Sequence, residues 1–166
     1  MNIFKKNTTP SSANEAPQQT EPEVSANTLL RQCLDEIGCH YEQEGSEFHV
    51  VYQGENLIVY GGEDTRFVLI RDLWWHSANA DDLTAVSLIR RAINECNING
   101  RATLIYSFNN EEHLMGVHSQ IEIVFIKEVP ELTNFLRYTF DTILHSHHFF
   151  YQTMETLRQE DYSKNN

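Results

Sequence analysis

Positively charged residues are scarce in this 166-residue chain, which has 12 Lys and Arg against 24 Asp and Glu. The formal net charge is therefore -12. Nucleic-acid backbones and anionic lipid headgroups are bound mainly through clustered basic side chains, and Lys5 and Lys6 are the only adjacent lysines. We expect neither nucleic acid nor a membrane as a partner.

Paired cysteines and long apolar runs are also lacking. Cys33, Cys39 and Cys96 are odd in number and show no C-x-x-C spacing, which argues against a disulfide framework or a zinc motif. No run approaches the roughly 20 apolar residues of a membrane-spanning helix, and no apolar segment typical of a signal peptide follows Met1. A cytoplasmic location is the resulting expectation.

Sequence signatures of catalysis are missing as well. The chain has no G-x-S-x-G elbow, no glycine-rich phosphate loop, no H-E-x-x-H pair and no cysteine with an obvious base. The acidic residues at 63–64 and 111–112 fall in predicted turns, where carboxylates are ordinarily solvated. We therefore predict no enzyme, no catalytic residue and no cofactor.

The chain does contain one domain of apolar sequence behind a polar N-terminal segment. Residues 7–24 hold three of the four prolines and almost no apolar side chain, so they cannot offset the entropy of being ordered. We predict a disordered tail over 1–24, one domain over 25–159 and a disordered C-terminus over 160–166. The 40% of apolar residues suffices for a core without disulfide or metal support.

Apolar periodicity predicts a helix followed by strands in the first half. Helical spacing covers 26–37, with Ser25 as N-cap and Gly38 as the stop. Aromatic and β-branched residues with intervening turns then predict three antiparallel strands, over 48–52, 57–60 and 66–71.

The second half repeats this order. Asn79 is a candidate N-cap for a helix that ends near Asn97. Two or three strands are predicted next, over 101–108, 114–117 and 120–126. Gly116 would form a bulge, and Pro130 would begin a last helix that runs to about Arg158. The fold class is α+β: helix, three strands, helix, two or three strands and helix, with an antiparallel sheet packed against the helices.

The last helix carries an apolar seam at alternating spacings of four and three residues. Its length suggests packing on the sheet and then on something else. Trp74 and Trp75 are adjacent, so in a strand they would face opposite sides of the sheet. We predict an interaction surface from these residues: Trp74, Trp75, Leu136, Phe140, Ile143, His147, Phe150, Tyr151 and Met154.

Histidines raise two questions on this helix. His145 and His148 are three residues apart, with Asp141 four before His145, but no further ligand is apparent, and we predict no metal. His147 interrupts the apolar seam, so burial should lower its pKa unless Asp141 or Glu155 approaches it. Replacing His147 with leucine is then expected to stabilise the protein and reduce its sensitivity to acid.

The order of elements resembles a known family. The Phe48–Tyr60 hairpin around Gly54, and the Ala92–Asn97 helix end leading into Ala102–Tyr106, are similar to the YbjN-type family of bacterial sensory transduction regulators. That family shares the fold of type III secretion chaperones, and the likeness covers about residues 25–157. The resemblance implies a non-enzymatic domain whose relatives in fold bind extended protein segments and often pair as dimers.

Two hypotheses about function follow. The first is a chaperone-like or regulatory module that binds a protein partner, forms a homodimer and uses the sheet and the last helix as its surface. The alternative is a small-molecule site or an enzyme, with a pocket near Trp74 and His76.

Overall fold

The computed structural model describes residues 24–62 and 66–164 of the chain. Most of the predicted tail, residues 1–23, and the last two residues lie outside the described residues. The elements are α1 (Ala26–Ile37), β1 (His40–Glu44), β2 (Glu47–Tyr52), β3 (Glu55–Gly61), β4 (Phe67–Asn79), α2 (Leu83–Asn99), β5 (Thr103–Asn109), β6 (Leu114–Val124) and α3 (Leu132–Lys164).

The six strands form one sheet in the order β1-β2-β3-β4-β6-β5, and every neighbouring pair is antiparallel. The predicted α+β class is therefore confirmed. The prediction missed β1, because its sequence His-Tyr-Glu-Gln-Glu is almost entirely polar and only alternates between exposed and half-buried positions.

Local signals explain the first helix and the first hairpins. The Ser25 hydroxyl accepts a hydrogen bond from the Thr28 N–H at 3.3 Å, and Gly38 ends α1 with a φ of 80°, as expected. Between β2 and β3 the turn consists of two residues, Gln53 and Gly54, whose φ values of 51° and 91° suit a tight hairpin.

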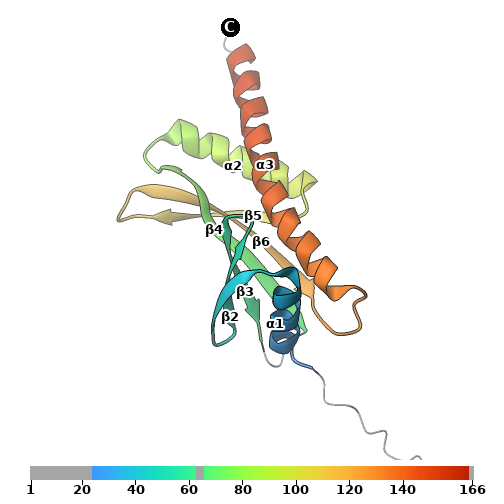
Figure 1. The fold of residues 1–166 in the computed structure, drawn as a ribbon. Helices are drawn as coiled ribbons and strands as arrows, with labels where there is room; N and C mark the ends of the chain where they lie inside the picture. The colour runs from blue at the N-terminus through green and yellow to red at the C-terminus, as the bar shows by residue number, and fades with distance from the viewer. Residues whose placement is uncertain (1–23, 63–65, 165–166) are drawn as a thin grey trace, which may run out of the picture.

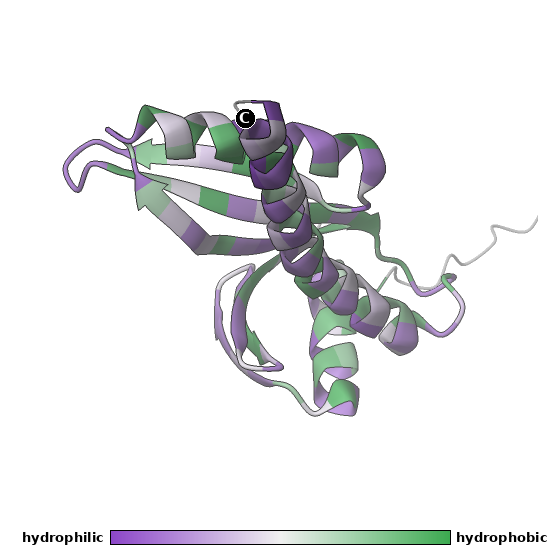
Figure 2. Ribbon diagram, turned by 90° about the horizontal axis from the view of Figure 1, so that it is seen from above, coloured by the Kyte–Doolittle hydropathy of each residue, from purple (hydrophilic) through white to green (hydrophobic). Residues whose placement is uncertain are grey.

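All three helices pack on one face of the sheet, and α3 crosses it from α1 to α2 (Figure 1). Seen from above, the visible part of α3 consists mainly of hydrophilic residues (Figure 2). Beneath the helices lie two apolar clusters: one joins α1, β2, β3 and the first half of α3, and the other joins α2, β5, β6 and the second half. The single helix α3 therefore spans both cores.

Helix boundaries differ from the prediction at three points. Asp82, not Asn79, caps α2, because its carboxylate accepts from the N–H groups of two residues in the first turn at 3.0 Å. Helix α3 starts at Leu132, past Pro130. It ends at Lys164 rather than Arg158, so a disordered C-terminus is wrong for residues 160–164.

The extended end of α3 has a partner in α2. Arg91 of α2 donates to the Asp161 carboxylate at 2.7 Å, and one turn earlier Leu157 is buried in the second core. The sequence signal for this extension is one apolar position followed by charges, which is typical of a solvated helix end.

The apolar seam of α3 is buried inside the chain. Its apolar members are at most 9% exposed, and they are Leu136, Phe140, Ile143, Phe150, Met154 and Leu157. The seam is therefore covered by the chain's own sheet and by α2. The prediction that this side of α3 is a free interaction surface is wrong for the first five of these residues and for His147, whose side chain is 11% exposed.

Within residues 24–62 and 66–164, no helix combines the length and the apolarity needed to cross a membrane.

Candidate functional site around the bulge in strand β4

Strand β4 is interrupted by a bulge that carries both tryptophans. Asp72 pairs with Ser119 of β6 and His76 pairs with Val117, so Leu73, Trp74 and Trp75 lie opposite the single residue His118. Trp74 has a φ of 60°, which costs a bulky residue about 1 to 3 kcal/mol. Such a cost persists only where surrounding contacts enforce the conformation.

Gly116 does not form the bulge that was predicted for it. Strand β6 is continuous from Leu114 to Val124, so Gly116 is not a bulge. It lies beneath the Trp74 indole, where an added Cβ would meet the ring at 2.1 Å. The bulge is in β4, and Gly116 provides the space that it needs.

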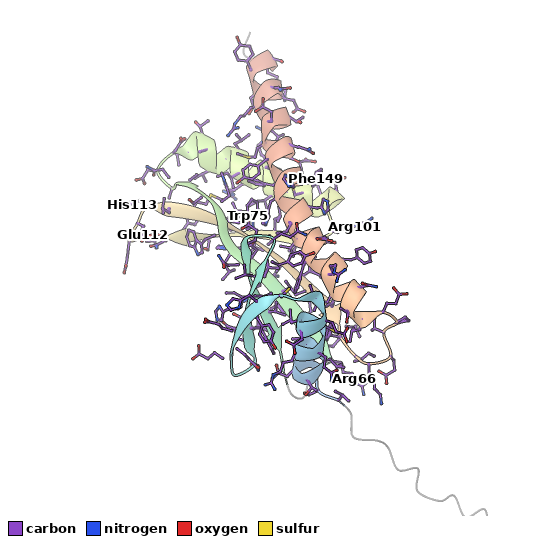
Figure 3. The ribbon with its side chains drawn as sticks, in the orientation of Figure 1. Arg66, Trp75, Arg101, Glu112, His113 and Phe149 are labelled. Atoms are coloured by element: carbon purple, nitrogen blue, oxygen red, sulfur yellow. The ribbon has the colours of Figure 1, made fainter. Side chains whose placement is uncertain are left out.

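The bulge directs the two tryptophans to opposite faces of the sheet. Trp74 lies on the face away from the helices, 42% exposed, with its indole edge-on to His118 at 5.2 Å between ring centroids. Trp75 lies where β4 passes beside α3 (Figure 3), half-buried and stacked on the His147 ring at 4.1 Å. Phe150 meets the Trp75 indole edge-on at 5.2 Å.

His118 is held by two hydrogen bonds on the outer face. The Trp74 backbone N–H donates to its Nδ1 at 2.9 Å, and its Nε2 lies 2.7 Å from the Ser107 hydroxyl. Burial, followed by the charge of Arg71, lowers the pKa of His118, which favours the neutral ring. A neutral ring that accepts at Nδ1 has its proton on Nε2, so it donates to Ser107 and cannot act as a base toward it.

A second polar group lies under α3, between the two apolar cores. His147 Nε2 is 3.2 Å from the Ser119 hydroxyl and 3.5 Å from the Asp72 carboxylate. The exposed fractions of the His147 and Asp72 side chains are only 11% and 4%. Of the two carboxylates considered from the sequence, Asp141 accepts from Tyr52 at 2.8 Å and Glu155 lies 3.8 Å from Arg158. Asp72, which sequence analysis did not consider, is the carboxylate beside His147.

Burial shifts both groups toward their uncharged forms. It raises the pKa of Asp72 from 3.8 to about 7, with the charge of Glu55 as a second cause. It lowers the pKa of His147 from 6.5 to about 4, with the charge of His148 as a second cause. In mildly acidic solution the pair therefore holds one proton as a carboxylic acid beside a neutral imidazole, rather than as an ion pair.

A cleft of about 390 Å³ opens beside this group, between α3 and the β2–β3 turn. The Tyr151 hydroxyl at its rim lies 3.4 Å from His76 Nδ1. His76 thus lies near this cleft, whereas Trp74 lies on the other face of the sheet. The lining includes Gln53, Glu55, Trp75, Asp141, His148 and Tyr151.

The histidines on α3 do not converge on a metal. His145 Nδ1 is 2.7 Å from the Asp141 carbonyl oxygen one turn earlier. In the two described ranges, no group of three His, Cys, Asp or Glu side chains is placed to hold an ion.

Comparison with known proteins adds information about the fold. No family model matches the sequence, and no curated protein matches it. An uncharacterized protein from Methanothermobacter thermautotrophicus superposes with a TM-score of 0.54 at 13% identity, over 79% of this chain and 97% of that one. YbjN from E. coli, named as a proposed transcription regulator, superposes with a TM-score of 0.51 at 12% identity, over 79% and 90%. The chain has a YbjN-like fold.

This likeness covers 79% of the chain and fits the fold that the sequence resemblance implied. At 12% and 13% identity it concerns the fold alone. Of the nine residues predicted as an interaction surface, Trp74 and Tyr151 are exposed, and Trp75 is half-buried against the second core. The free surface must therefore be sought elsewhere, and the outer strand β5 is one place where side chains and backbone are both accessible.

Proposed function

We propose that the protein is a non-enzymatic, chaperone-like or regulatory module that binds an extended segment of a protein partner along the outer edge of β5. The proposal is carried by the backbone of this edge. Strand β5 pairs with β6 on one side only, and among the described residues no strand pairs with its other side. An unpaired strand edge is a template for strand addition.

Asn97 shows which backbone groups point outward. Its side-chain amide accepts from the Leu104 N–H at 2.8 Å and donates to the Leu104 carbonyl oxygen at 2.9 Å, as a neighbouring strand would. Outward groups recur at every second residue of an antiparallel strand, so Tyr106 and Phe108 share this direction. In the described part of the chain, no hydrogen-bond partner occupies their outward groups.

The side chains of β5 also favour a partner. Residues 103–109 include no charge and no proline, which are the usual protections of an edge strand. Ile105, Tyr106 and Phe108 are between 38% and 47% exposed. The opposite edge, β1, is short and carries Glu42 and Glu44, so it is protected where β5 is not.

The net charge of -12 supports a protein partner over nucleic acid or a membrane. A second copy of the chain could add its own β5 to this edge, so homodimer formation belongs to the proposal as one form of strand addition. The cytoplasmic location stays a prediction.

Two changes to the edge are expected to weaken partner binding about tenfold. Tyr106→Pro removes an outward N–H without touching the bonds to β6, and Phe108→Lys adds a charge to the edge. Val51→Lys is the control, because Val51 is 43% exposed against 47% for Phe108 but lies on β2. Partners captured from the native host are quantified by mass spectrometry for each variant.

Light scattering at several concentrations separates the two occupants of the edge. Loss of a dimer in Tyr106→Pro and Phe108→Lys, with retention in Val51→Lys, identifies a second copy. Loss of a captured protein in the same pattern identifies a different partner. A strict monomer with no captured partner, or equal losses in all three variants, contradicts the proposal.

A further inference from the structure

The cleft beside α3 is negatively charged and lies apart from the β5 edge. Glu55, at the start of β3, and Asp141, on α3, are among its lining residues, while Lys and Arg are not. Burial, and after it the charge of Glu55, raises the pKa of both Tyr151 and Asp72. The charge of Glu55 therefore acts on Tyr151, which lines the cleft, and on Asp72, which lies beside the lining residue His147.

The structure holds Asp141 in position. Its carboxylate accepts from the Tyr52 hydroxyl at 2.8 Å and from the Gln53 side-chain amide at 3.0 Å, and both donors are neutral. Neutral donors orient the carboxylate without cancelling its charge. Together with Glu55, it presents two negative charges to one small volume.

Two aromatic rings complete the wall. The Trp75 indole and the Tyr151 phenol ring are 6.0 Å apart at 75°, so they meet at nearly a right angle. The stack with His147 fixes the orientation of the indole. Aromatic faces attract cations, tryptophan most strongly, and the attraction increases where water is excluded.

We propose that this cleft binds an organic ammonium ion, a primary or methylated amine on a short alkyl chain, with Glu55 and Asp141 neutralising its charge and Trp75 and Tyr151 contacting its carbon atoms. A cleft of about 390 Å³ accommodates such a group. The same chemistry could come from a free amine or from a lysine side chain of a protein. This inference does not depend on the proposed function, because the cleft and the β5 edge share no residue.

Isothermal titration at pH 8 tests the charge requirement with matched probes. Choline is compared with 3,3-dimethylbutan-1-ol, which has the same shape without the charge, and putrescine represents primary amines. Choline or putrescine is expected to bind at least about tenfold more tightly than the alcohol, and added salt should weaken this binding. If neither choline nor putrescine binds more tightly than the alcohol, the proposal is overturned.

Variants locate the binding. Glu55→Gln is expected to weaken amine binding about tenfold, and Asp141→Asn by a similar factor. Glu112→Gln in the β5–β6 turn changes the net charge equally but does not line the cleft, so its affinity should equal that of the unmodified protein. Unchanged affinity in Glu55→Gln, or an equal loss in Glu112→Gln, overturns the proposal even if Asp141→Asn fails to fold.

The source of the amine is distinguished in the same titration. N-acetyl-lysine methylamide and its norleucine counterpart are compared with putrescine. Tighter binding of the lysine compound than of putrescine, lost in Glu55→Gln, assigns the site to a protein lysine. Tighter binding of putrescine than of the lysine compound assigns the site to a free amine. Variants of β5 such as Phe108→Lys should bind either compound as tightly as the unmodified protein does.

Discussion

Gly116→Ala is expected to lower the free energy of unfolding by about 2 kcal/mol, although it adds only one methyl group. The added Cβ would lie 2.1, 2.3 and 2.7 Å from three ring carbons of Trp74. The backbone of β6 is fixed by pairing on both sides, with β4 and with β5. The indole must therefore move away from the sheet.

Movement of the indole affects the whole bulge. The Trp74 N–H that donates to His118 belongs to the residue with the positive φ, so its position depends on the contacts of the side chain. His118 in turn bonds Ser107 of β5. The cost should therefore include weakened hydrogen bonds around the bulge as well as the clash.

A double-mutant cycle measures the origin of the cost. Urea unfolding is followed for the unmodified protein, Gly116→Ala, Trp74→Ala and the double variant. Without the indole there is no ring to clash with, so Gly116→Ala should cost much less in the Trp74→Ala background. If it costs the same in both backgrounds, the contact between Gly116 and Trp74 does not determine the effect.

Local sequence signals were sufficient for elements whose apolar pattern is set by one packed face. Helix α1 follows from Ser25, the helical spacing and Gly38, and β2 follows from alternating Phe48, Val50 and Tyr52, all of which are buried. The seam of α3 was correctly identified as a packed face. Its partner was misassigned because periodicity indicates that a face is covered but not by what.

Features that depend on strand pairing rather than on an apolar pattern could not be predicted. The polar strand β1 is stabilised by its register with β2, and a period-2 pattern is almost invisible in its sequence. The sequence Trp-Trp-His after the predicted end of β4 has high strand propensity, which was the one available signal that β4 continues to Asn79. The bulge itself depends on the register with β6.

The candidate site illustrates the same limit. Neither the pairing of Asp72 with His147 nor the partnership of Asn97 with Leu104 has a sequence signature, because each joins elements that meet only in the folded chain. The adjacent tryptophans were rightly expected on opposite faces, but the bulge in β4, and not the regular alternation of a strand, places them there. Which of them would line a cleft depends on the position of α3.

The second large effect concerns the buried pair of Asp72 and His147, whose separate contributions to the pH dependence of stability should be opposite in sign. For Asp72 the folded pKa of about 7 exceeds the ordinary 3.8, so the folded state binds more protons and stability rises as the pH falls through 7. For His147 the folded pKa of about 4 lies below 6.5, so stability falls as the pH drops below 6.5.

In the unmodified protein the two contributions largely cancel between pH 4 and 6.5. The folded pair then holds one proton on Asp72, and the unfolded chain also holds one, on His147. This changes the expectation for His147→Leu. The variant loses the histidine contribution, but it keeps Asp72, so it should gain stability on acidification rather than merely become less sensitive to acid.

Removing one partner at a time should therefore reveal how each group alone makes the unfolding free energy depend on pH. Between pH 7.5 and 5.5, the unfolding free energy of His147→Leu is expected to rise by about 2 kcal/mol, and that of Asp72→Asn to fall by about 1 kcal/mol. At pH 7.5 His147→Leu should be less stable than the unmodified protein, because the Asp72 carboxylate is then charged and buried without a partner.

Urea unfolding at the two pH values is measured for the unmodified protein, both single variants and the double variant Asp72→Asn/His147→Leu. The double variant retains every other titrating group, so its change with pH is the baseline for the rest. After subtraction, the unmodified protein should change little, while the single variants change in opposite directions. Slopes of the same sign would show that the two groups do not share one proton under α3. A large pH dependence of the unfolding free energy in the unmodified protein would show instead that one of the two groups is solvated. The 3.5 Å contact between His147 and Asp72 would then not describe the protein in solution.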